Sequence, residues 1–226
     1  MEKLITAMQK CSLFKDLGSQ EILNILRTIK YAVNSYKKGQ VIASEGEACM
    51  SLGIVLEGAL EAQKVYASGK TVVMSHLNPG NIFGEAIIFS QFRKEYPATI
   101  TAVQDSKVMF ISSKDIIRLC SENNLFLEHF LEHLSTKILV LNKKIRILSF
   151  ETLRQKIAVY LLEECRKQRK NEIILPMNKK ALAEYLGVQR PSLSRELCRM
   201  RDAGLIAFNN KTVWILDPEA LEELSF

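Results

Sequence analysis

The sequence predicts an α+β protein with an N-terminal antiparallel β-roll, a long helix and a C-terminal winged helix-turn-helix. Three observations favour this fold: glycine-punctuated β-prone runs fill the first half, a 3.5-residue leucine repeat follows, and two glycine-separated helical patterns precede a hairpin. The expected boundaries are residues 1–121 for the β-roll domain, 122–149 for the long helix and 150–226 for the winged helix-turn-helix domain.

The first half begins with helical segments near residues 2–9 and 19–30 and then changes to short β-prone runs. The runs are 40–43, 52–56, 59–66, 71–77, 98–103 and 107–111. Glycines fall near the turns between them, and short strands at this spacing are typical of an antiparallel roll or barrel. A closed roll of this size can hold one small ligand, so we expect this domain to sense an effector.

A long helix is predicted from about Asn123 to Ser149. Its apolar residues alternate in steps of four and three: Leu127, Leu131, Leu134, Ile138, Leu141, Ile145 and Leu148. That period indicates the seam of a two-stranded coiled coil, and hence a homodimer. The alternative is a helix that buries one stripe against its own domain. Ser149 and Phe150 then form an expected hinge, after which residues 152–167 start the next domain.

Residues 178–204 carry the pattern of a helix-turn-helix. Asn178 is a good N-cap, Gly187 supplies a left-handed turn residue, and Pro191 suits the first turn of a second helix. In that second helix, Leu193, Leu197 and Met200 are spaced to pack inward, while the opposite face carries Arg190, Ser192, Arg195 and Arg199. Two β-prone runs, 205–208 and 212–216, flank a turn and predict the wing.

Charge distribution supports a nucleic-acid partner. The chain has a formal net charge of +6, but residues 165–201 alone hold ten Lys and Arg against three acids. This polarisation is typical of one nucleic-acid-binding module joined to a module with another task. Arginine side chains on one helix face are able to reach phosphates and base edges. A dimer presents two such helices, so we expect a palindromic site on double-stranded DNA.

Several classes of protein are disfavoured. No apolar run is long enough to span a bilayer and no secretory signal stands at the start, so we expect a cytoplasmic protein without a membrane partner. Five scattered cysteines argue against a disulfide framework or a metal cluster, and we expect no metal and no cofactor. His129 and His133 are spaced to chelate zinc but are expected on a solvated face. Only His76 lies in the strand region, which disfavours a metal-dependent enzyme.

The order of β-roll, long helix and winged helix-turn-helix resembles the Crp/Fnr family of bacterial transcription regulators. The sharpest pieces are residues 81–85, Asn-Ile-Phe-Gly-Glu, and residues 186–195, Leu-Gly-Val-Gln-Arg-Pro-Ser-Leu-Ser-Arg. The resemblance implies base reading by Arg190 and Arg195, and RNA polymerase as a further partner. It also implies positions near the phosphate backbone for Asn178, Lys179, Lys180 and Gln189. Pro191 replaces the glutamate of many members, so one base contact should be missing or replaced.

The resemblance also bears on the effector. Family members that bind cyclic nucleotides use a cassette from Phe-Gly-Glu to an arginine followed by Ser or Thr. This chain keeps the beginning, but the matching end, residues 96–99, is Tyr-Pro-Ala-Thr. Burying a phosphate without a cation costs on the order of several kcal/mol. We therefore expect allosteric control by a small organic effector other than cyclic AMP.

The residues expected around that effector are Phe83, Gly84, Glu85, Ile87, Tyr96, Thr99, Leu141 and Asn142. Two alternatives stay open. Arg93 and Lys94 could supply the missing charge after a loop shift, which would make the protein responsive to cyclic nucleotides. A cysteine could instead make it responsive to thiol oxidation.

Overall fold

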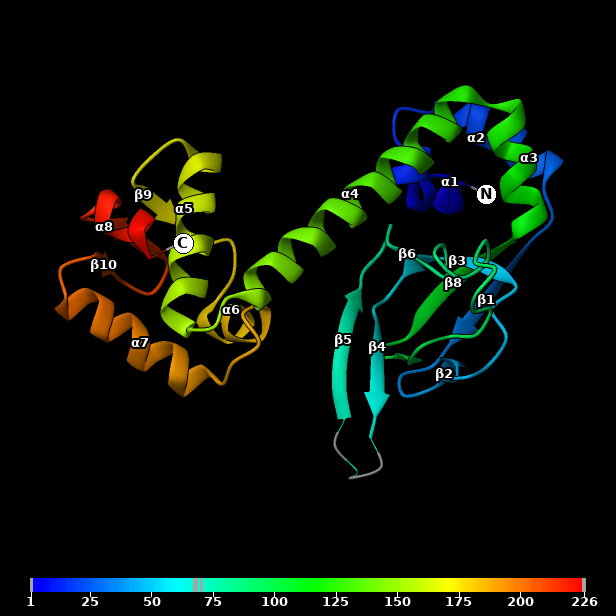
Figure 1. Ribbon diagram of the computed structural model, residues 1–226. Helices are drawn as coiled ribbons and strands as arrows, with labels where there is room; N and C mark the ends of the chain where they lie inside the picture. The colour runs from blue at the N-terminus through cyan, green and yellow to red at the C-terminus, as the bar shows by residue number, and fades with distance from the viewer. Residues whose placement is uncertain (1, 67–68, 70, 225–226) are drawn as a thin grey trace. The chain divides into compact units, whose positions relative to one another are not determined.

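The computed structural model describes residues 2–66, 69 and 71–224 of the chain (Figure 1). Two compact units divide it, residues 1–135 and 136–226. The boundary between them falls inside the long helix α4 (Asn124–Ser149). The sequence predicted a separate helical segment, residues 122–149, between the two domains. In the structure each half of this helix packs with a different unit, so the three-part division stays a prediction.

The first unit is the predicted antiparallel roll. It opens with α1 (Glu2–Gln9), a 3₁₀ turn (Ser12–Phe14) and α2 (Ser19–Thr28), and it continues through α3 (Ser113–Glu122) into α4. The strands between are β1 (Tyr31–Tyr36), β2 (Val41–Ala43), β3 (Ser51–Glu57), β4 (Leu60–Val65), β5 (Thr71–Leu77), β6 (Ile82–Phe83), β7 (Thr99–Ala102) and β8 (Ser106–Ser112). They form two four-stranded antiparallel sheets, ordered β1-β8-β3-β6 and β2-β7-β4-β5.

The core of the roll is packed closely around one aromatic ring. Phe83 lies against the backbone of Gly53, where an added Cβ would stand 2.1 Å from the ring. Its ring meets Phe110 edge-on at a centroid distance of 6.0 Å and Tyr96 at 6.5 Å. Position 53 therefore requires glycine because a side chain there would overlap the Phe83 ring, and not because of an unusual backbone angle.

The first half of α4 packs against the N-terminal helices of its own unit (Figure 1). Phe126 and Phe130 are buried, and His129 is buried as well, with its Nδ1 atom 3.4 Å from the Leu13 carbonyl oxygen. His133 is half-buried and its Nδ1 atom lies 3.1 Å from the Ser12 hydroxyl. The expectation of a solvated face for both histidines is wrong, because the side of α4 away from the leucine seam is covered by these helices.

The second unit contains the end of α4, then α5 (Leu153–Gln168), β9 (Glu172–Ile174), α6 (Lys179–Tyr185), α7 (Arg190–Asp202), β10 (Ile206–Phe208), β11 (Thr212–Ile215) and α8 (Pro218–Glu223). The hairpin of β10 and β11 is completed by β9 into a three-stranded sheet. A separate core forms around the buried Tyr160, Leu182, Leu197 and Met200.

The fold class is confirmed, and so is each strand-forming run that the sequence indicated. Six elements went unpredicted: the 3₁₀ turn at Ser12–Phe14, β1, β6, α3, β9 and α8. Two of these strands are only two or three residues long, and their pairing depends on distant partners rather than on local alternation. No helix among the described residues is long and apolar enough to cross a membrane.

Candidate nucleic-acid interface and effector site

The turn between α6 and α7 is built as the sequence predicted. The Asn178 side chain caps α6 by accepting a hydrogen bond of 3.0 Å from the Ala181 backbone N–H. At the other end, Gly187 has a φ of 70°, and the Val188 N–H donates to the Ala183 carbonyl at 2.9 Å. This bond closes a Schellman motif, which ends α6 and turns the chain toward α7.

Helix α7 separates an apolar face from a basic face. Leu193, Leu197 and Met200 are buried in the core of the second unit. Arg190 and Arg195 are exposed, and neither makes an ion pair or a side-chain hydrogen bond with any residue that the structure describes. Their guanidinium groups are therefore available for an outside acceptor, such as a phosphate or the edge of a guanine.

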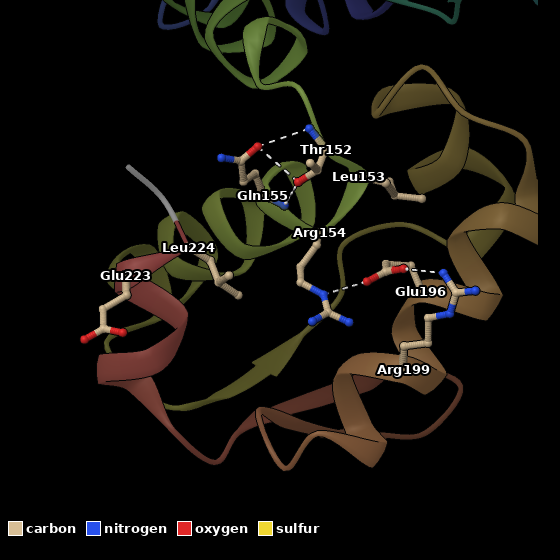
Figure 2. Close-up of a pocket in the computed structure, with 8 residues that line it drawn as sticks. All are labelled: Thr152, Leu153, Arg154, Gln155, Glu196, Arg199, Glu223 and Leu224. Carbon is tan, nitrogen blue, oxygen red and sulfur yellow. Dashed lines mark hydrogen bonds and ion pairs between the residues drawn. The ribbon is translucent and has the colours of Figure 1, made fainter.

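Arg199 differs from these two arginines. Arg199 lines a surface pocket of about 550 Å³. Figure 2 shows Glu196 between Arg199 and Arg154 in this pocket. Glu196 accepts a hydrogen bond of 2.7 Å from Arg154 Nε and contacts Arg199 Nη1 at 3.4 Å. The three-residue spacing from Glu196 to Arg199 could have indicated their contact. The Arg154 partner, 42 residues away, left no signal in the sequence.

The remaining candidate DNA contacts take varied positions. Lys180 and Gln189 are exposed, while Ser192 is half-buried. The Lys179 ammonium lies 4.6 Å from the centroid of the Phe208 ring, which links α6 to the wing. The Asn209 side chain shapes the wing turn by accepting from the Lys211 and Thr212 N–H groups at 2.8 and 2.7 Å.

The candidate effector residues divide between the two units. Phe83, Gly84, Glu85 and Tyr96 are buried in the first unit, and Ile87 is half-buried there. Thr99 is also half-buried, and its Oγ1 atom accepts a hydrogen bond from the Glu45 N–H at 3.1 Å. Leu141 and Asn142 are exposed and belong to the second unit. The structure thus brings six of the eight together in one unit.

Glu85 has a neighbour that the sequence did not indicate. Its Oε1 atom lies 3.8 Å from Nε2 of His133, which comes from α4. Both atoms belong to largely buried side chains, so this contact joins the turn after β6 to the long helix inside the roll. Of the other candidates, Arg93 and Lys94 are exposed on the loop before Tyr96.

The thiols of the roll are poorly suited to redox chemistry. Burial raises the pKa of Cys11 to about 11, and burial also raises the pKa values of Cys49 and Cys120. Reactive cysteines need thiolate character at neutral pH, and these environments oppose it. Among the described residues, no group of three or more His, Cys, Asp or Glu side chains is suited to a metal ion.

Two family models match separate parts of the chain. Residues 33–123 match the cyclic nucleotide-binding domain, and residues 155–224 match the Crp-like helix-turn-helix domain. Together they span the roll and the DNA-binding unit in the order that defines one class of regulator. The chain belongs to the Crp/Fnr family.

Its relatives are regulators of transcription. The chain is 24% identical to the cyclic AMP receptor protein of Thermus thermophilus, with 97% of this chain and 99% of the relative covered. It is 26% identical to the nitrogen fixation regulation protein FixK of Rhizobium meliloti, covering 85% and 86%. The solved structure of CprK complexed with OCPA shares the fold at 16% identity and a TM-score of 0.67, covering 90% and 93%. This Crp/Fnr protein is accordingly a DNA-binding transcription regulator.

Proposed function

We propose that this regulator is a homodimer that recognises a palindromic DNA site through two copies of α7. The observation that carries the proposal is the pair of exposed arginines, Arg190 and Arg195, without partners among the described residues. Each is suited to bidentate bonding with guanine O6 and N7. The exposed Lys180 and Gln189 are assigned to contacts with the DNA phosphate backbone. Arg199 is assigned a weaker contact with DNA, because its guanidinium group is already paired with Glu196.

Dimerisation is supported by the leucine seam of α4. In the single chain, Ile138, Leu141 and Ile145 are 58%, 58% and 65% exposed, and Leu131 and Leu148 are exposed as well. Leu127 and Leu134 are half-buried, and Leu134 packs on the core of its own unit. An exposed apolar stripe of this length on one helix face is typical of a surface that a partner covers. The partner we propose is a second copy of α4.

For the effector we propose a small organic molecule other than cyclic AMP, bound in the roll and acting on DNA affinity. The loop after the Phe83–Glu85 motif is mostly exposed and leads to Tyr96, Ala98 and Thr99, which carry no positive charge for a phosphate. Related proteins differ in ligand: one is a cyclic AMP receptor protein, and CprK has been solved as a complex with OCPA. Isothermal titration calorimetry tests this part directly, and low-micromolar binding of cyclic AMP would overturn it.

The DNA-binding part is tested by selecting bound sequences from a random pool, with and without an extract of cell metabolites. We expect a palindromic consensus whose affinity changes with the extract. Arg190→Ala and Arg195→Ala should each relax the consensus at one position per half-site and cost ~1–3 kcal/mol there. Arg27→Ala, which removes an exposed arginine of the first unit, is the matched control. Equal weakening on all sequences would contradict base reading.

Activation would further require a surface that touches RNA polymerase, which we retain as a proposed partner. Transcription in vitro from a promoter carrying the selected site, with purified polymerase, measures this contribution. Repression without any change in polymerase recruitment would contradict direct contact.

A further inference from the structure

The end of α4 is joined to α5 by an ion-pair cluster that the sequence did not indicate. Lys143 Nζ lies 2.6 Å from Oε2 of Glu163 and 3.6 Å from Oε1 of Glu164. The exposed fractions of these three side chains are 23%, 18% and 7%. The lysine is therefore held largely out of solvent between two carboxylates of the DNA-binding unit.

Two further cations complete the cluster. Arg146 Nη1 lies 4.0 Å from Glu163 Oε1, and Lys167 Nζ lies 2.9 Å from Glu164 Oε1. Removing Lys143 would take from Glu163 its nearest cation among the described residues and leave the more distant Arg146, which weakens the contact between α4 and α5. Lys143 is the member that contacts both carboxylates, so the link between α4 and α5 depends on it.

Apolar packing follows the same face of the helix. Ile147, one turn after Lys143, is fully buried in the core of the second unit. The next residue, Leu148, lies close to Gly187 in the turn between α6 and α7, where a Cβ added to the glycine would stand 3.0 Å from the leucine side chain. The end of α4 therefore also approaches the turn before α7. Residues 143 and 147 thus share one face, whereas Leu141 and Ile145 share the exposed seam on the other.

These contacts lie on either side of the expected hinge at Ser149 and Phe150. The chain does leave the helix there, but the segments on either side are tied together by Lys143, Glu163 and Ile147. We propose that Lys143 is a positioning residue for DNA recognition, which fixes the angle between the α4 seam and α7. This inference rests on the proposed dimer, in which that angle sets the separation of the two recognition helices.

The test uses the full chain and a set of DNA duplexes carrying the selected palindrome with zero, one or two base pairs added or removed at its centre. A duplex with a single half-site reports binding by one module alone. Lys143→Met removes the charge and keeps most of the apolar stem, and Lys143→Arg restores the charge. Lys144→Met is the matched control, since Lys144 is exposed and has no ion pair with the described residues.

We expect Lys143→Met to bind the natural spacing about tenfold more weakly and to discriminate poorly among spacings, with half-site affinity unchanged. Lys143→Arg should restore the preference, and Lys144→Met should keep it. Equal loss on the half-site and the palindrome would overturn the positioning role, as would a spacing preference that survives Lys143→Met. If the unmodified protein shows no spacing preference, the dimeric function itself fails and this inference falls with it.

Should Lys143→Met lower the thermal stability, Glu163→Gln provides a second variant that keeps the lysine. It should reduce spacing discrimination in the same direction while half-site binding shows that the module is folded. Unchanged discrimination in a folded Glu163→Gln protein would also overturn the proposal.

Discussion

Two isoleucines in the last turns of α4 allow dimerisation and folding to be separated. Ile145 is 65% exposed in the single chain, whereas Ile147 is fully buried in the second unit. Full burial of an isoleucine side chain is worth ~1.5–3 kcal/mol. About two thirds of that is unrealised at Ile145 until a partner covers it, so each copy stands to gain ~1–2 kcal/mol in the dimer.

Because both copies contribute, Ile145→Ala should weaken the dimer by ~2–4 kcal/mol, which corresponds to a roughly 30-fold to nearly 1000-fold larger Kd. Sedimentation equilibrium over a concentration series measures this constant. Ile147→Ala should instead lower the free energy of unfolding by ~2–5 kcal/mol through the cavity it leaves. A dimer Kd for Ile145→Ala within about threefold of the unmodified protein would refute the assignment of this face to a partner.

Two further predictions concern the roll. Gly53→Ala should destabilise the first unit by ~1–3 kcal/mol, since the new methyl group would overlap the Phe83 ring; thermal unfolding measures it, and an unchanged melting temperature would contradict the packing. Burial raises the Cys11 pKa from 9.0 to about 11. The contribution of the protonated Cys11 thiol to the free energy of unfolding is therefore fully present below pH 9 and is lost between pH 9 and 11. In denaturant titrations Cys11→Ala should lose less stability over that interval, and equal losses in both proteins would contradict this origin.

Much of the recognition module could be predicted from sequence because its signals are local. The Asn178 cap, the Gly187 turn and the inward residues Leu193 and Leu197 act within one or two helical turns. Their conformations follow from backbone sterics and helix periodicity, which are encoded in neighbouring residues. The strand runs of the roll were recognisable for the same reason.

The environment of α4 was predicted less well. The leucine period indicated an apolar seam and left open packing against its own domain, as Leu134 shows, but it gave no sign that His129 would be buried by the N-terminal helices. Helical periodicity marks which residues share a face. It does not say which distant segment covers that face.

The order of elements, the helix-turn-helix and the apolar period of the long helix follow from the sequence alone, because caps, glycines and side-chain spacing act over a few residues. The packing of each folded unit was needed to show that Glu196 contacts Arg154, that Glu85 lies beside His133, and that Lys143 contacts Glu163. Each of these contacts joins segments separated by 20 or more residues, and such pairs are set by packing of the whole unit rather than by any local pattern.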